Sequence, residues 1–172
     1  MRKEEISKDT PILLRHRQPP ERVEIRHPEN VRWKCVRCHA CCGDTTEHIR
    51  HIRMRHSEVL DISRLTKKAP RSFCFPIKGF ERFKFEMQKQ TSGNCVFLSA
   101  DTCTIYRNRP LTCRFYPFFL KQSSEKQFEF CLTDERCPGL SQETLIDQAF
   151  YVRLFRTASK KISRQHNSRQ SF

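Results

Sequence analysis

The chain has 172 residues, which is enough for one ordinary domain with terminal arms. Its 33 Lys and Arg outnumber 19 Asp and Glu, and the formal net charge of +14 is compatible with an anionic partner such as nucleic acid. No apolar run approaches the roughly 20 residues that a bilayer span needs, and the short run Ile12–Leu14 lacks the pattern of a secretory signal, so we expect a cytoplasmic protein without a membrane span.

Residues 1–32 form the first predicted segment. Four of the nine prolines lie here, and residues 1–34 carry 9 basic against 6 acidic side chains. Charged, proline-containing stretches of this kind bury too little apolar surface to fold alone. The sequence therefore predicts a basic N-terminal arm, after which Trp33 is expected to cover the cysteine region.

A helix is predicted over residues 45–67. Asp44 and Glu47 have the spacing of a capping box, in which the first side chain caps the start of a helix. Apolar side chains then recur at helical spacing, at Ile49, Ile52, Val59 and Leu60. Pro70 is expected to end this segment.

Phenylalanine dominates the following part of the chain, where residues 73–130 hold eleven of the fourteen. Alternation with period two predicts a strand over 83–87, and a turn after it predicts a return strand over 95–98. A weaker strand is predicted over 128–130. The phenylalanines are expected to fill a core around this small sheet rather than to stack on bases.

The last predicted element is a helix that begins at an N-cap residue, Ser141, and runs to about Ile162. Residues 141–172 thus form a C-terminal helix with a basic tail, after a central cysteine domain over 33–140. The fold class predicted is α+β. We expect a small metal-stabilised module with much irregular structure, one or two helices and a short antiparallel sheet.

All ten cysteines lie in the central domain, between Cys35 and Cys137, and the flanks have none. This density is typical of a scaffold held together by disulfides or by metal. An even count would permit disulfides, but in a reducing cytoplasm clustered thiols are more often metal ligands. The sequence therefore predicts metal binding.

The first cysteine run is Cys35-Val36-Arg37-Cys38-His39-Ala40-Cys41-Cys42, or CxxCxxCC. Soft thiolates select zinc, copper(I) or iron–sulfur clusters. Zinc ribbons use separated CxxC pairs, whereas CxxCxxC with a remote Cys-Pro, here Cys137-Pro138, is closer to ferredoxin-type ligation. Adjacent Cys41 and Cys42 cannot both easily face one centre, and two centres sharing the run would resolve this.

A second group of motifs follows, and arginines flank its cysteines. The motifs are Cys95-Val96-Phe97-Leu98, Cys103-Thr104-Ile105-Tyr106 and Arg109-Pro110-Leu111-Thr112-Cys113-Arg114-Phe115-Tyr116-Pro117-Phe118. We expect Arg107, Arg109 and Arg114 to offset the negative charge of thiolates, and binding of an anionic substrate is the alternative. His39 and the other histidines are less favoured as ligands, because thiols are so abundant.

Together, these motifs resemble the YkgJ-type CxxCxxCC cysteine-cluster family over roughly residues 33–140. That family is described as zinc- or iron-chelating and is often labelled iron–sulfur. The resemblance implies an eight-cysteine metal module with the ligands Cys35, Cys38, Cys41, Cys42, Cys95, Cys103, Cys113 and Cys137. Cys74 and Cys131 lie outside the pattern. Some members are linked to lysine N-methylation of flagellin, but this chain has only four glycines and no glycine-rich loop for S-adenosylmethionine.

The sequence thus predicts a protein with two thiolate-ligated centres, each an iron–sulfur cluster such as [4Fe-4S] or a Zn²⁺ ion. Its expected role is structural, redox or electron transfer, with an unidentified protein or redox partner. One alternative is a metalloenzyme that modifies a macromolecule. Another is a zinc-stabilised nucleic-acid-binding module, which is less favoured because 18 basic minus 11 acidic residues place +7 of the net charge within residues 35–140.

Overall fold

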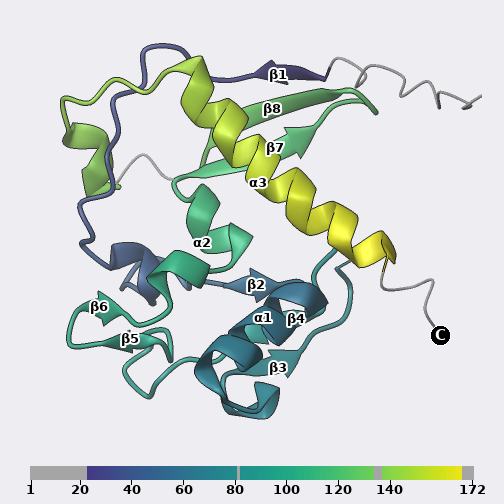
Figure 1. Cartoon of the computed structure of the whole chain (residues 1–172). Coiled ribbons are helices and arrows are strands. Elements are labelled where there is room, and N and C mark those ends of the chain that lie inside the picture. Colours follow the sequence, from purple (N-terminus) through teal and green to yellow (C-terminus); the bar gives the residue numbers. More distant parts are fainter. Residues whose placement is uncertain (1–22, 81, 134–136, 168–172) are drawn as a thin grey trace, which may run out of the picture.

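The computed structural model describes residues 23–80, 82–133 and 137–167 (Figure 1). Within these ranges the strands are β1 (Glu24–Arg26), β2 (Arg53–Met54), β3 (Cys74–Pro76), β4 (Phe85–Met87), β5 (Leu98–Ser99), β6 (Thr102–Cys103), β7 (Phe118–Gln122) and β8 (Gln127–Leu132). The α-helices are α1 (His56–Thr66), α2 (Leu111–Phe115) and α3 (Gln148–Asn167). Irregular segments join these short elements, which confirms the small α+β module predicted from the sequence and adds the one-turn helix α2.

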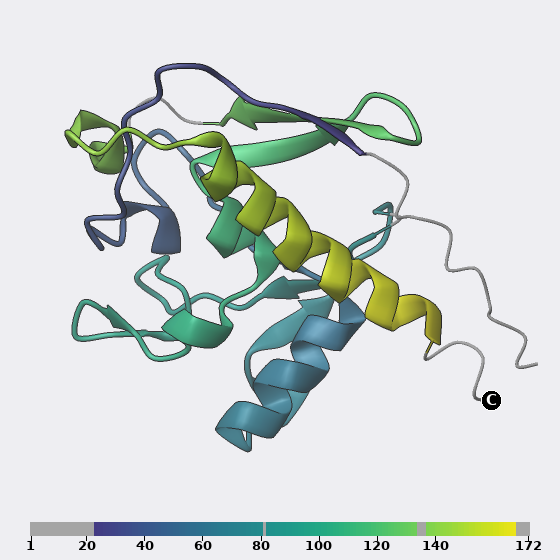
Figure 2. The ribbon, with the colours of Figure 1, turned by 45° about the horizontal axis from the view of Figure 1, so that its top comes forward.

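One sheet has the strand order β1-β8-β7 and is crossed by α3 (Figures 1 and 2). β7 and β8 pair antiparallel, and β1 joins β8 in parallel. Between this sheet and α3 lies a cluster that we call the α3 core, in which Phe118, Phe130 and Tyr151 are at most 2% exposed. The strand predicted over 128–130 is confirmed here as part of β8. The described end of the N-terminal arm supplies β1, while residues 1–22 lie outside the described part.

Tyr151 leads to a first prediction. It is fully buried, and its hydroxyl has no hydrogen-bond partner among the described residues. Because leaving a buried polar group unpaired costs about 1–3 kcal/mol, we expect Tyr151→Phe to raise the free energy of unfolding by about 1 kcal/mol. Urea denaturation checks this, and a destabilised variant would mean that the hydroxyl has a partner.

The same residue predicts a loss of stability in alkali. Burial raises the pKa of Tyr151 from 10.0 to about 12. The unfolded chain therefore releases this proton at a lower pH than the folded chain does, and stability falls as pH rises above about 10. The Phe variant is expected to lack this component of the alkaline loss.

The second sheet has the order β2-β4-β3, is antiparallel throughout and packs against α1. Met54, Ile62 and Phe73 are fully buried in the cluster that we call the α1 core. The strand predicted over 83–87 is found as β4. Sheet formation here follows the prediction because the residues alternate between the core and the surface.

The return strand predicted over residues 95–98 is found only in part. After the turn, Cys95 forms an antiparallel bridge with Lys89, and the N–H of Val96 donates to the carbonyl of Gln88 at 3.1 Å. β4 itself is paired on both edges, by β2 and β3, so the return does not extend along it. Leu98 instead begins the hairpin β5-β6. Ala100 and Asp101 form its turn with φ of 44° and 55°, the left-handed conformation that a two-residue hairpin turn requires.

The helix predicted over 45–67 is wrong in its first half, because α1 begins only at His56. Asp44 does not cap it. Its carboxylate accepts hydrogen bonds from the backbone N–H of Arg50 at 2.7 Å and from Nζ of Lys89 at 2.6 Å. The helix starts instead at a capping box closed by Glu58.

The C-terminal helix likewise starts at Gln148 rather than at Ser141. The segment before it pairs with the chain ahead of the first cysteine, and the N–H of Trp33 donates to the carbonyl of Thr144 at 2.8 Å. Asp147 supplies the cap by accepting a backbone N–H of the first turn at 2.9 Å. Among the helices described, none is both long and apolar enough to cross a bilayer.

Candidate metal centre

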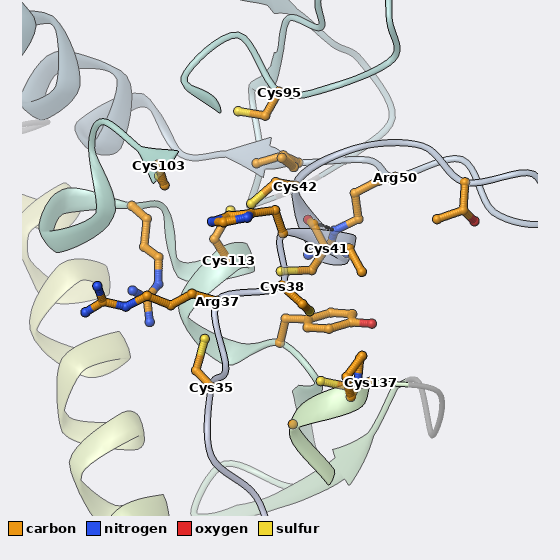
Figure 3. A pocket seen from close by; sticks show the side chains of 18 of the residues that line it. Cys35, Arg37, Cys38, Cys41, Cys42, Arg50, Cys95, Cys103, Cys113 and Cys137 are labelled. Atoms are coloured by element: carbon orange, nitrogen blue, oxygen red, sulfur yellow. Dashed lines mark hydrogen bonds between the residues drawn. The ribbon is translucent and has the colours of Figure 1, made fainter. Parts of the chain in front are cut away.

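A cavity of about 310 Å³ lies beside the α1 core and extends to Trp33, which packs against the α3 core (Figure 3). Eight cysteines line it: Cys35, Cys38, Cys41, Cys42, Cys95, Cys103, Cys113 and Cys137. Cys74 and Cys131 are outside the lining. The fold thus brings together, from segments far apart in the chain, the eight cysteines that carry the motifs.

The CxxCxxCC run is folded into a tight loop along one wall of the cavity. Arg37 and His39 adopt left-handed conformations, with φ of 54° and 61°. The 3₁₀ turn Ala40–Cys42 follows, closed by a hydrogen bond from the N–H of Cys42 to the carbonyl of His39 at 2.7 Å. Left-handed residues at alternate positions change the direction of the chain, which allows closely spaced thiols to face the same cavity.

Gly43 lets the second group of cysteines approach this loop. A Cβ atom there would lie 2.4 Å from Oδ1 and 3.0 Å from the Cα of Asn94, so Asn94 and its backbone would have to move away. The neighbouring N–H of Cys95 donates to the carbonyl of Cys42 at 2.6 Å. The glycine is therefore needed for a close backbone approach that joins the two motif groups.

Helix α2 presents Cys113 to the cavity. Leu111 and Phe115, four residues apart, face the α3 core, and Cys113, halfway between them, packs on the α1 core. The buried carboxylate of Glu58 holds the start of α2 by accepting the N–H of Leu111 at 2.7 Å. Thr112 adds a hydrogen bond from its hydroxyl to the carbonyl of Arg53 at 2.7 Å.

Cys137 reaches the cavity because its segment docks on the residues before Cys35. The N–H of Lys34 donates to the carbonyl of Gly139 at 3.0 Å. The buried indole N–H of Trp33 makes no hydrogen bond of ordinary geometry to the described residues, and it faces Cys137. Burial raises the pKa of Cys137, while the N–H groups of Gly139 and Trp33 act in the opposite direction by favouring its thiolate.

Backbone N–H groups are directed at three of the cavity sulfurs. Those of Phe97, Ile105 and Gly139 each favour the thiolate of the cysteine two residues earlier, namely Cys95, Cys103 and Cys137. Cys74 lacks such a donor and instead gives its own S–H to the carbonyl of Pro70 at 3.3 Å. These three sulfurs are thus placed to accept hydrogen bonds, and Cys74 is bonded as a neutral thiol.

Several of the cavity thiols ionise less readily than free cysteine. Burial, opposed by Arg50 and aided by neighbouring cysteines, raises the pKa of Cys113 to about 12. Burial is also the main cause of the raised pKa of Cys95 and Cys103. Thiolates packed this closely repel one another, although backbone N–H groups stabilise some of them. A soft cation bound between the sulfurs would remove the repulsion, so the site suits such a cation.

The arginines at the cavity are Arg37, Arg50 and Arg109. None of them forms an ion pair with a described acidic side chain, so their charge is available to offset thiolates. The sequence also predicts that Arg107 and Arg114 offset thiolate charge, but neither of them lines the cavity. Arg114 instead donates to the carbonyl of Arg109 at 3.0 Å.

Arg50 was not singled out by the sequence, although it joins the two halves of the site. It donates from Nε to the carbonyl of Cys41 at 3.2 Å and from its terminal nitrogen to the carbonyl of Thr112 at 3.3 Å. Its guanidinium also lies 5.0 Å from the ring centre of Tyr116. Because neither motif predicts this contact across the fold, only the structure identifies it.

We expect Arg50→Ala to destabilise the protein by about 1–2 kcal/mol, because two part-buried carbonyls lose their donor. Arg50→Lys keeps the charge but not the fork that reaches both carbonyls, so it is expected to recover less than half of this loss. Urea denaturation of both variants measures the difference. Full recovery in Arg50→Lys would show that only the charge matters.

Histidines contribute little to the cavity. His39 and His48 belong to its lining, whereas His51 contacts the carboxylate of Glu86 at 2.7 Å and His56 packs on Phe85. Among the described residues, no three His, Cys, Asp or Glu side chains stand in metal-ligand geometry. The eight thiols surround a common space, and each has a single side-chain torsion through which its sulfur can turn toward a metal.

Comparison with known proteins identifies a metal-chelating family. A family model described as "CxxCxxCC: Putative zinc- or iron-chelating domain" matches residues 34–138. No curated protein and no solved structure is significantly similar to the chain. The match covers more than half of the chain and spans all eight cavity cysteines. The chain therefore belongs to the CxxCxxCC family of zinc- or iron-chelating domains.

Proposed function

We propose that the cavity holds metal through eight thiolate ligands, as iron–sulfur clusters or as Zn²⁺, and that the bound metal serves a structural, redox or electron-transfer role in the cytoplasm. The ligands are Cys35, Cys38, Cys41, Cys42, Cys95, Cys103, Cys113 and Cys137. The chain's own residues provide the sulfurs, the N–H groups that support them and the guanidinium groups that offset their charge.

The backbone N–H groups beside Cys95, Cys103 and Cys137 are the observation that carries this proposal. A backbone donor aimed at sulfur favours the thiolate, the form that binds metal. Three separate segments repeat this arrangement around one cavity. Cys74, which is comparably buried but lies elsewhere, does not share it.

Charge supports the same conclusion. Four thiolates around Zn²⁺, or around a cluster core of charge 2+, leave a net charge of about −2. Arg37, Arg50 and Arg109 at the cavity counter such a charge. These cations therefore have a use inside the molecule, so part of the net charge of +14 is accounted for without nucleic acid.

Anaerobic purification followed by metal analysis, acid-labile sulfide analysis and a visible spectrum tests the proposal. Brown protein that contains acid-labile sulfide and absorbs at about 400 nm identifies iron–sulfur clusters. Colourless protein with stoichiometric zinc identifies Zn²⁺ sites. Folded protein that is free of metal, as isolated and after anaerobic reconstitution, would overturn the proposal. Cys131→Ala is the matched control, because Cys131 lies on β8 outside the cavity, and its metal content is expected to equal that of the wild type.

A further inference from the structure

Given the metal binding proposed above, the eight cysteines still have to be divided among centres. We propose two centres of four sulfurs each: an inner centre held by Cys42, Cys95, Cys103 and Cys113, and an outer centre held by Cys35, Cys38, Cys41 and Cys137. The inner centre is built into the α1 core and the outer centre faces solvent.

Packing separates the two sets. Cys95 is buried within the α1 core, and Cys42, Cys103 and Cys113 pack directly against that core. None of the four cysteines of the outer set belongs to either described core. Cys35 and Cys38 are exposed. In Figure 3, Cys95, Cys103 and Cys42 lie in the upper part of the view, Cys35 and Cys137 in the lower part, and Cys113, Cys41 and Cys38 near the middle.

Backbone geometry decides the positions of Cys41 and Cys42. They are consecutive, and their thiols lie within hydrogen-bond reach of each other, so the boundary between the two sets runs between them. Cys42 is joined to the inner set by the hydrogen bond from the N–H of Cys95 to its carbonyl at 2.6 Å and by its packing on the α1 core. Cys41 then completes the outer set, whose order along the chain, CxxCxxC with a distant Cys-Pro, has the ferredoxin-type spacing.

Arg50 stands at the boundary between the two centres. It bonds to the carbonyl of Cys41 in the outer set and to that of Thr112, next to Cys113 in the inner set. Each four-thiolate centre is anionic, and two such centres repel each other. A guanidinium group between them reduces this repulsion, which explains a cation placed inside the site rather than at its rim.

Burial predicts that the two centres differ in lability. The outer centre, with two exposed cysteines, is expected to exchange its metal with solvent or transfer electrons to a partner. The inner centre packs on the α1 core, in which Cys95 is buried, and is expected to be structural. The same protein would thus combine a permanent cross-link with an accessible metal.

Metal release into excess EDTA from the anaerobically purified protein tests this division. We expect two phases of similar amplitude, with the faster phase carrying about half of the zinc or iron. Cys38→Ala should retain about half of the metal, lack the fast phase and melt close to the wild-type temperature. Cys113→Ala should lose at least the half of the metal that is released slowly, and it should melt at a lower temperature than the wild type.

Release in one phase, or complete loss of metal in Cys38→Ala, would overturn the division into two centres while leaving metal binding intact. Absence of metal from the wild type would instead overturn the proposed function. Because Cys38 is exposed, Cys38→Ala is expected to fold even if Cys113→Ala does not. Cys74→Ala, outside both sets, should keep both phases.

Discussion

Glu58→Ala is expected to lower the free energy of unfolding by about 2–5 kcal/mol, because it leaves two buried N–H groups without an acceptor. Glu58 is 1% exposed. One carboxylate oxygen accepts the N–H of Leu111 at 2.7 Å, and the other accepts the N–H of Arg55 at 3.1 Å. The side chain therefore ties the start of α1 to the start of α2. Urea denaturation measures the loss.

Two variants calibrate this result. Glu58→Gln keeps an acceptor oxygen and the side-chain length, so it is expected to cost about 1–2 kcal/mol. Asp61→Ala, on the same helix, removes only the exposed ion pair with Arg64 and is expected to cost less than about 0.5 kcal/mol. A loss in Glu58→Ala no larger than that of Asp61→Ala would show that the carboxylate does not join the helices.

Gly139→Ala is expected to destabilise the protein by about 1–3 kcal/mol through overpacking. A Cβ atom at this buried position would lie 2.6 Å from the carbonyl oxygen of Lys34 and 2.8 Å from Nε1 of Trp33. The neighbouring backbone carbonyl has little freedom to move, so the 137–139 segment must shift. Cys137 would then leave its place at the cavity, and metal analysis is expected to show a loss of up to half of the metal.

Gly79→Ala is the matched control for this substitution. Nothing lies within 4 Å of the added Cβ, but φ is +84°, so only the backbone conformation is strained. We expect a cost of about 1 kcal/mol and an unchanged metal content. Equal metal loss in both variants would rule out a specific role for the contact between Gly139 and Trp33.

The sequence was a good guide to elements whose pattern is local. Alternation identified β4, and the short pattern Phe128–Phe130 identified the centre of β8. Prediction from the sequence failed where the backbone pairs with residues far along the chain. The apolar period of Ile49 and Ile52 suggested a helix, but residues 53–54 pair with β4 and Asp44 bonds to Lys89. Tertiary contacts of this kind override local propensity and leave no mark in one sequence.

For the site, the resemblance to the CxxCxxCC family implied the eight cysteines that line the cavity, whereas spacing alone pointed only to the CxxCxxCC run and the remote Cys137. It could not identify the groups that arrange them. Arg50, Glu58 and Trp33 Nε1 act through contacts with residues far along the chain. The chain has many charged side chains, and no local pattern distinguishes Arg50 from the other basic residues.

The docking of Gly139 on Lys34 also imposes an order on biosynthesis. The chain emerges from the ribosome at about 5–20 residues per second, N-terminus first. Every sulfur of the inner set is available once Cys113 has emerged, while the outer set waits for Cys137 to return to the segment ahead of Cys35. If the two proposed centres exist, the nascent protein could therefore acquire its structural metal before its accessible one. Closing the second centre would require synthesis to have passed Cys137, so it would follow the first.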